Sequence, residues 1–194
     1  TDIDDLPSRI ILLCDLIERA CDQDADAALA GIFLIPNGRY VVAHPIHTAT
    51  MAALIARRSP QIMAQRRSVI AAALTMNISM LALQEQLCLQ NEPLTDDQRQ
   101  AIHEHPEKSY AMLQSLGVDD PIWLQGVLEH HETIDGKGYH LGLRYGEISL
   151  AGKLVALSDI YTAMIAERGY RPQALPNMAM REVFLLRGEK IDSS

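Results

Sequence analysis

Aromatic residues and cysteines are scarce in this sequence. Phe, Trp and Tyr together make up 5% of the 194 residues, with two Phe and one Trp. The hydrophobic core is therefore expected to consist of aliphatic side chains. The three cysteines, Cys14, Cys21 and Cys88, lack the spacing of a metal site, and an odd number predicts free buried thiols in a reducing cytoplasm.

Long apolar runs and an excess of basic residues are also absent. No apolar run approaches the roughly 20 residues that a membrane-spanning helix needs, so no span is expected in this chain. The acidic start does not resemble a signal peptide. The formal net charge of −8 argues against binding a nucleic acid polymer, although a few local arginines could still hold a small phosphate ligand. We expect a cytoplasmic chain, and its polar end at 188–194 suggests a fragment of a longer signalling protein.

Apolar residues recur at helical spacing along almost the whole chain. The predicted helices cover residues 6–20, 25–34, 41–58, 61–80, 96–105, 107–116, 121–131, 150–167 and 181–186. Thr95 is predicted to be the N-cap of the helix over 96–105, and Pro106 is predicted to perturb the end of that helix. Pro121 is predicted to begin another helix. The glycines of residues 133–148 predict a loop. We therefore predict an all-α fold in which residues 1–39 form a small N-terminal helical extension.

Five residues on separate predicted helices or helix ends have the chemistry of metal ligands: His44, His105, His130, His131 and Asp159. Imidazole and carboxylate groups suit borderline divalent metals such as Zn, Mn or Fe. A two-metal centre of such groups generates hydroxide near neutral pH and clamps a phosphodiester for in-line attack. The alternative is that these histidines are ordinary core or surface residues.

The stretch 127–139, VLEHHETIDGKGY, resembles the HHExxDGxGYP signature of the HD-GYP phosphodiesterases. The residues that match its signature loop are Glu132, Asp135, Gly136, Gly138 and Tyr139. Further segments resemble family motifs in the same order: YxxxH at 40–44, LT at 94–95, HP at 105–106, the glycine loop at 141–148, AxxDxY at 156–161 and an RPYR-like turn at 168–171. The resemblance implies an HD-domain-like helical bundle with a Gly-rich loop over residues 40–194, and a function in bacterial cyclic di-GMP signalling.

One string departs from the family pattern. The family's AALLHDIGK falls on residues 72–80, where Met76, Asn77 and Met80 replace its His, Asp and Lys. The resemblance implies that this Asp bridges two metals, that the His ligates one of them, and that the Lys assists phosphate chemistry. A thioether and a neutral amide are poor replacements for such ligands. The Pro of GYP is also replaced, by His140.

The family's two ligand sets survive unequally in this chain. By the resemblance, one set keeps His44 and Asp159, with Asn77 as a further candidate. The other keeps His105, His130 and His131, three neutral imidazoles that resemble a mononuclear zinc set. We therefore expect either one divalent metal, Zn, Mn or Fe, or none, and both outcomes stay open.

Arg168 and Arg171 occupy positions where, by the same resemblance, the family contacts substrate phosphates. The planar guanidinium group suits bidentate phosphate binding. The alternative is that both are solvated loop arginines.

Three functions are compatible with these residues. The first is a degenerate, catalytically impaired HD-GYP domain that acts as a receptor or regulator, binding cyclic di-GMP, a related cyclic dinucleotide or a partner such as a diguanylate cyclase domain. The second is a residual metal-dependent cyclic di-GMP phosphodiesterase. The third is a pure protein-interaction module in which the histidines are relics.

Overall fold

The computed structural model describes residues 5–34, 39–166, 174–188 and 190–191. Within these ranges the chain is helical, with no β-strand beyond two isolated bridges, so the all-α prediction is confirmed. The helices are α1 (Leu6–Gln23), α2 (Ala25–Leu34), α3 (Tyr40–Ala56), α4 (Pro60–Met63), α5 (Arg66–Thr75), the 3₁₀ helix η2 (Ile78–Met80), α6 (Leu81–Leu89), α7 (Asp96–Ser115), α8 (Pro121–Glu129), α9 (Leu150–Ile165) and α10 (Pro176–Leu185).

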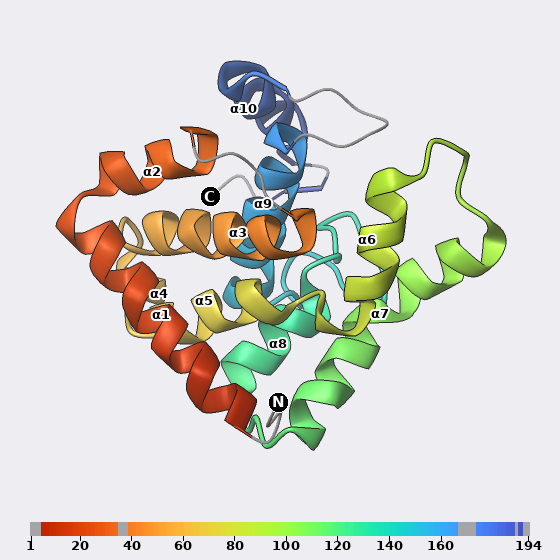
Figure 1. Ribbon diagram of the computed structural model, residues 1–194, viewed down its shortest axis with the longest axis horizontal. Helices are drawn as coiled ribbons and strands as arrows, with labels where there is room; N and C mark the ends of the chain where they lie inside the picture. The colour runs from red at the N-terminus through yellow and green to blue at the C-terminus, as the bar shows by residue number, and fades with distance from the viewer. Residues whose placement is uncertain (1–4, 35–38, 167–173, 189, 192–194) are drawn as a thin grey trace.

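Helix α3 crosses the middle of the molecule and packs against α5 and α9 (Figure 1). Helix α8 also packs against α5 and α9, so these four helices form the centre of the fold. Their buried faces are rich in alanine, including Ala49, Ala52 and Ala72. Small side chains let the helices approach closely, because the side chains at a contact set the interaxial distance. The indole N–H of the buried Trp123 donates a hydrogen bond to the Thr75 hydroxyl at 2.7 Å.

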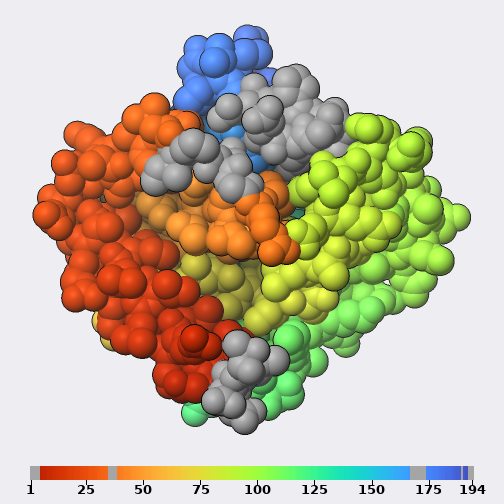
Figure 2. Space-filling view, in the orientation of Figure 1, coloured from red at the N-terminus to blue at the C-terminus, as the bar shows by residue number. Residues whose placement is uncertain are grey.

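Helices α1 and α2 cover one side of this centre, and the α6–α7 pair covers the opposite side (Figure 2). Helix α1 contributes Ile10, Cys14 and Cys21 to the main core. Burial raises the pKa of the Cys14 thiol to about 12, so this thiol stays protonated. The expectation of free buried thiols is confirmed for Cys14 and Cys21, while Cys88 is half-buried. The boundary at residue 39 between extension and domain stays a prediction.

The predicted helix starts at residues 95 and 121 are confirmed. Thr95 accepts the Gln98 backbone N–H, and the Gln98 side chain accepts the Thr95 N–H, which completes a capping box. Asp120 accepts the backbone N–H groups of the first turn of α8, in which Pro121 is the first residue. In both cases residues within three positions of one another form the cap, which is why the sequence pattern predicts these helix starts well.

Other predictions of helix extent are wrong. The last helix, α10, begins at Pro176 rather than at residue 181, and α6 was not predicted. The helix expected over 61–80 is divided into α4, α5 and η2, with a turn at Met76 and Asn77. Pro106 does not interrupt its helix, because α7 continues from Asp96 to Ser115 with this proline buried inside. A proline leaves one helix carbonyl without its usual N–H donor, and in α7 a histidine ring supplies the replacement donor, as described below.

One helical stretch, Arg66–Leu89, is long and apolar enough by composition to cross a membrane. Half of its most apolar window is buried inside the fold, and the stretch comprises α5, η2 and α6 rather than one straight helix. Core helices of a folded domain pass the same test of length and composition, so this stretch is weak evidence for a span.

Candidate functional site

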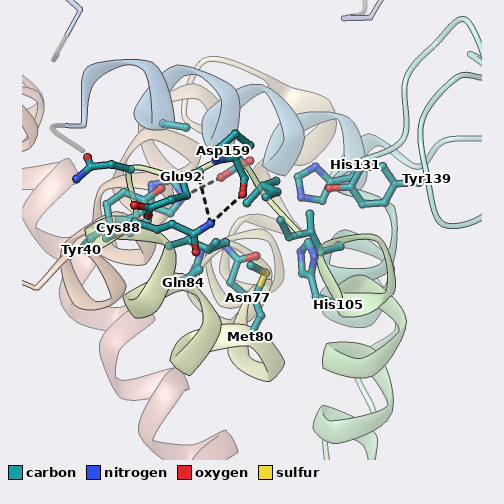
Figure 3. A pocket seen from close by; sticks show the side chains of 18 residues that line it. Tyr40, Asn77, Met80, Gln84, Cys88, Glu92, His105, His131, Tyr139 and Asp159 are labelled. Atoms are coloured by element: carbon teal, nitrogen blue, oxygen red, sulfur yellow. Dashed lines mark hydrogen bonds and ion pairs between the residues drawn. The ribbon is translucent and has the colours of Figure 1, made fainter. Parts of the chain in front are cut away.

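A pocket of about 570 Å³ lies between α3, α6, α7 and α9. Four of the five predicted metal ligands line it: His44, His105, His131 and Asp159. The last three are labelled in Figure 3. One wall is the connection from α6 to α7, where the side-chain amides of Gln90 and Gln98 exchange hydrogen bonds of 3.1 and 2.7 Å. The fold therefore brings together in one cavity residues that are more than a hundred positions apart.

Three of the predicted ligands form a compact cluster. One ligand nitrogen from each of His105, His130 and His131 lies within 4.8 Å of the others. His105 comes from the middle of α7, whereas His130 and His131 follow the last residue of α8. His105 and His130 are buried and His131 is half-buried. This is the three-imidazole set that the resemblance predicted.

The proline beside His105 orients its imidazole ring. Pro106 has no backbone N–H, so the Ile102 carbonyl one turn earlier lacks its helical donor. The Nδ1 of His105 lies 2.5 Å from that carbonyl oxygen and donates to it. A carbonyl can only accept, so the proton of a neutral His105 is on Nδ1 and the lone pair is on Nε2.

His130 is oriented in the same way. Its Nδ1 donates to the Val127 carbonyl at 2.7 Å, which leaves its Nε2 as an acceptor. The Nε2 atoms of His105 and His130 then face each other at 3.1 Å, lone pair toward lone pair. Such an arrangement needs a cation to be favourable. The donor set therefore fits one divalent metal, with backbone carbonyls fixing the ring tautomers.

Burial keeps this cluster in the ligand-competent form. Burial is the largest cause that lowers the pKa of each of the three imidazoles, and the pKa of His105 falls to about 3, with His130 as the next cause. The Ile102 carbonyl opposes this decrease without cancelling it. The imidazoles are therefore neutral near neutral pH, and only a neutral imidazole ligates a metal.

The depressed pKa of His105 predicts a pH-dependent stability for metal-free protein. The folded-state pKa of about 3 lies below the ordinary 6.5, so the unfolded state binds the proton more tightly. The contribution of neutral His105 to the free energy of unfolding is then fully present above about pH 6.5 and is lost as the pH falls toward about 3. Urea midpoints measured with a chelator should fall between about pH 7.5 and 5, and His105→Gln should reduce that decrease. An unchanged midpoint over this range would contradict the prediction.

His44 and Asp159 form a separate pair in the same pocket. The Nε2 of His44 lies 2.8 Å from a carboxylate oxygen of Asp159. Burial is the largest single influence and raises the pKa of Asp159, but the hydrogen bond and charge of His44 together with His131 and His130 outweigh it, so the net shift is downward. Tyr40 stacks on the His44 ring with centroids 4.8 Å apart. The buried Nδ1 of His44 has no hydrogen-bond partner within the described residues, and the role of His44 and Asp159 as metal ligands stays a prediction.

The signature loop is held by a buried carboxylate. The two oxygens of Glu132 accept the backbone N–H groups of Leu141, Gly142 and Leu143 at 2.6 to 3.1 Å. A Cβ on Gly138 would lie 2.5 Å from backbone atoms of residues 131–133, so only glycine fits there. The HHExxDGxGY string thus largely shapes the backbone beside the histidine cluster.

The remaining signature residues also have local partners. Asp135 accepts from the Thr133 hydroxyl at 2.6 Å, and this hydrogen bond is the main cause that lowers its pKa to about 2. Gly136 has a φ of +76°, which favours glycine. Tyr139 stacks between the rings of His131 and His103, with centroids 4.6 and 4.3 Å away. Tyr139 therefore supports the ring of a candidate ligand.

The residues that depart from the family string lie in two environments. Met76 is completely buried in the main core and is not among the residues that line the pocket. Asn77 and Met80 do line it, on the side of His105 (Figure 3). A neutral amide and a thioether thus take part in the pocket where the family has an acid and a lysine.

One functional residue was missed by sequence reasoning. Glu129 is buried immediately before the histidine pair, and its carboxylate accepts the Ser149 backbone N–H at 2.7 Å. This bond ties the end of α8 to the start of α9. An acid next to two histidines at the end of an apolar helix was a usable signal. Arg168 and Arg171, the predicted phosphate contacts, lie outside the described residues.

Comparisons with known proteins identify the family of this chain. The HD domain family matches residues 20–194, so the chain belongs to the HD domain family. The chain also resembles relatives named as cyclic di-GMP phosphodiesterases, which agrees with the HD-GYP resemblance of the HHExxDGxGY string. It is 26% identical over 159 residues to a cyclic di-GMP phosphodiesterase of Pseudomonas aeruginosa, a match that covers 82% of this chain and 38% of the relative.

Further relatives have related names. A cyclic di-GMP phosphodiesterase response regulator of Xanthomonas campestris is 28% identical over 65% of this chain and 34% of its own length. A 3′3′-cGAMP-specific phosphodiesterase of Vibrio cholerae is 30% identical over 68% of this chain and 28% of its own length. The matches therefore span between 28% and 38% of the length of these curated relatives. A solved HDG"Y"P protein from Bdellovibrio bacteriovorus shares the fold, with a TM-score of 0.63 and 16% identity over 99% of this chain and 69% of that one.

Proposed function

We propose that this chain is a catalytically impaired HD-GYP domain that binds a cyclic dinucleotide and acts as a regulatory module. The observation that carries the proposal is the presence of Asn77 and Met80 in the pocket, where the family motif has an acid and a lysine. An uncharged amide oxygen is a poor bridge between two dications, which favour carboxylates. The loss of both charges removes two groups on which family chemistry depends.

Ligand binding can persist without that chemistry. The three-histidine cluster could hold one metal, whose positive charge would attract a phosphate of the ligand. No Lys or Arg is among the described residues that line the pocket. The remaining positive charge is therefore expected from Arg168 and Arg171. The named substrates of the relatives make a cyclic dinucleotide the expected ligand, and a diguanylate cyclase domain stays a hypothetical protein partner.

The alternative function is a residual phosphodiesterase, and the three-histidine cluster is the observation that favours it. A metal held there would supply Lewis-acid activation of water. The chain's own contribution would be to hold the imidazoles neutral and oriented. Without the bridging acid and the lysine we expect a rate loss of about 10³-fold or more relative to an intact site.

Calorimetry and a hydrolysis assay on the same protein test both functions. We expect saturable binding of cyclic di-GMP that Arg168→Ala weakens at least about tenfold, with Arg99→Ala, an exposed arginine of α7, as the control. In the presence of Mn, Fe or Zn, no hydrolysis product of cyclic di-GMP should accumulate with time. The double substitution Asn77→Asp/Met80→Lys should increase the rate of hydrolysis. Turnover by the unmodified chain at rates typical of enzymes would overturn the proposal in favour of the alternative. Absence of any binding would favour an interaction module.

A further inference from the structure

A second cavity, of about 590 Å³, lies between the end of α3, α4, α9 and the signature loop. It shares no lining residue, among those described, with the pocket that contains the histidines. Its walls are mainly aliphatic and include Ile134, Ile148 and Leu157, and no aromatic residue is among its described lining. Its volume is in the range of small-molecule sites.

Three cationic side chains line this aliphatic cavity: Arg58, Lys153 and Lys190. Their gathering is notable in a chain with a formal net charge of −8. Within the described residues, Arg58 and Lys190 have no ion-pair partner and are exposed, whereas the Lys153 ammonium lies 4.2 Å from the centroid of the Tyr145 ring. Among the described lining residues the one acid is Glu132, which already accepts three backbone N–H groups of the loop. The cavity thus combines an apolar interior with a surplus of positive charge.

We propose that this cavity binds a small amphipathic carboxylate with an aliphatic chain. The chain would lie among the isoleucine and leucine side chains, where burial of apolar surface is favourable. The carboxylate would face Arg58 and Lys190, since an arginine fork suits a carboxylate. A nucleotide fits less well, because the described lining offers no aromatic ring on which a base could stack.

The position of this cavity connects it to the histidine cluster. The consecutive residues His131 and Glu132 line different cavities, the first the histidine pocket and the second the aliphatic one. Glu132 holds the loop amides at 141–143. A ligand packed against Glu132 would therefore stabilise these hydrogen bonds. Its binding would make the loop beside His131 more rigid. This inference does not depend on the function proposed above.

Titration calorimetry with octanoate, and with 1-octanol as the uncharged analogue, tests the site. We expect one octanoate per chain with a Kd below about 1 mM, and binding of octanol at least about fivefold weaker. Arg58→Gln/Lys190→Gln should raise the octanoate Kd about five- to tenfold. The matched control Arg9→Gln/Lys108→Gln removes the same charge from exposed positions elsewhere and should leave the Kd unchanged. Ala156→Leu, which fills the cavity without changing charge, should also weaken binding.

Two outcomes would overturn the site. The first is absence of saturable octanoate binding, or equal binding by the control and cavity variants. The second is competition between octanoate and cyclic di-GMP for one site, since the two cavities are separate. Amide hydrogen exchange tests the connection: octanoate should slow exchange at residues 141–143 at least about threefold, and unchanged exchange in the octanoate-saturated protein would overturn the link to the loop.

Discussion

His131→Gln and His105→Gln should each lower the bound divalent metal from about one per chain to below about 0.1. Each substitution removes one of three imidazoles whose ligand nitrogens lie within 4.8 Å of one another. Loss of a ligand itself should weaken affinity more than the 10–100-fold that is typical of losing an outer partner, so about 10²-fold or more is expected. Elemental analysis of protein purified without chelator, followed by chelator competition, measures both quantities.

Two further histidines separate ligand loss from general damage. His47 lies on α3 outside the cluster, so the His47→Gln variant should keep the metal. His44→Gln tests the other part of the pocket, because His44 pairs with Asp159 rather than with the three imidazoles. We expect it to retain most of the metal. Metal below about 0.1 per chain in the unmodified protein, or metal retained by both cluster variants, would contradict a three-histidine site.

Glu132→Ala should lower the free energy of unfolding by about 3–6 kcal/mol, the largest stability effect expected for a polar substitution in this chain. Glu132 is only 4% exposed. Its substitution leaves three loop N–H groups without their acceptor. Leu141 and Gly142 are exposed and Leu143 is half-buried, so the estimate rests on the loss of hydrogen bonds to a charged acceptor, which contribute about 1.5–3 kcal/mol each. Urea denaturation of metal-free protein at neutral pH measures the effect directly.

Two variants serve as controls for this measurement. Glu132→Gln keeps an accepting oxygen and should cost less than Glu132→Ala. Glu147→Ala removes an exposed glutamate of the same loop, which accepts one N–H from Arg144, and should cost about 1 kcal/mol or less. If Glu132→Ala cost no more than Glu147→Ala, the buried carboxylate would not be what holds the loop.

Local features of this protein could be predicted well from the sequence, because neighbouring residues create them. The capping box at Thr95 and the start at Pro121 are of this kind. The prediction for Pro106 failed because it considered only the lost N–H. The structure shows that the His105 ring donates to the Ile102 carbonyl in its place, so the helix continues.

Some features of the candidate site could likewise be predicted from the sequence, and others could not. The HHExxDGxGY string identified the loop and its histidine pair, since glycines and a loop-binding acid occur at fixed spacing. It could not show that Met76 is buried in the core while Asn77 lies in the pocket, because a turn between α5 and η2 sets the direction of each side chain. Nor could it show that Glu132 lines a second, aliphatic cavity.

By itself, the sequence determined the helical class, the family and the residue types available for metal chemistry, because periodicity and motif spacing are local properties. Only the tertiary structure decided which of these residues meet. The packing of α7 against α8 places His105 beside His130, 25 positions later, with their Nε2 atoms 3.1 Å apart. The packing of α3 against α9 instead joins His44 to Asp159. Such pairings depend on how helices cross, and no spacing within one helix encodes that.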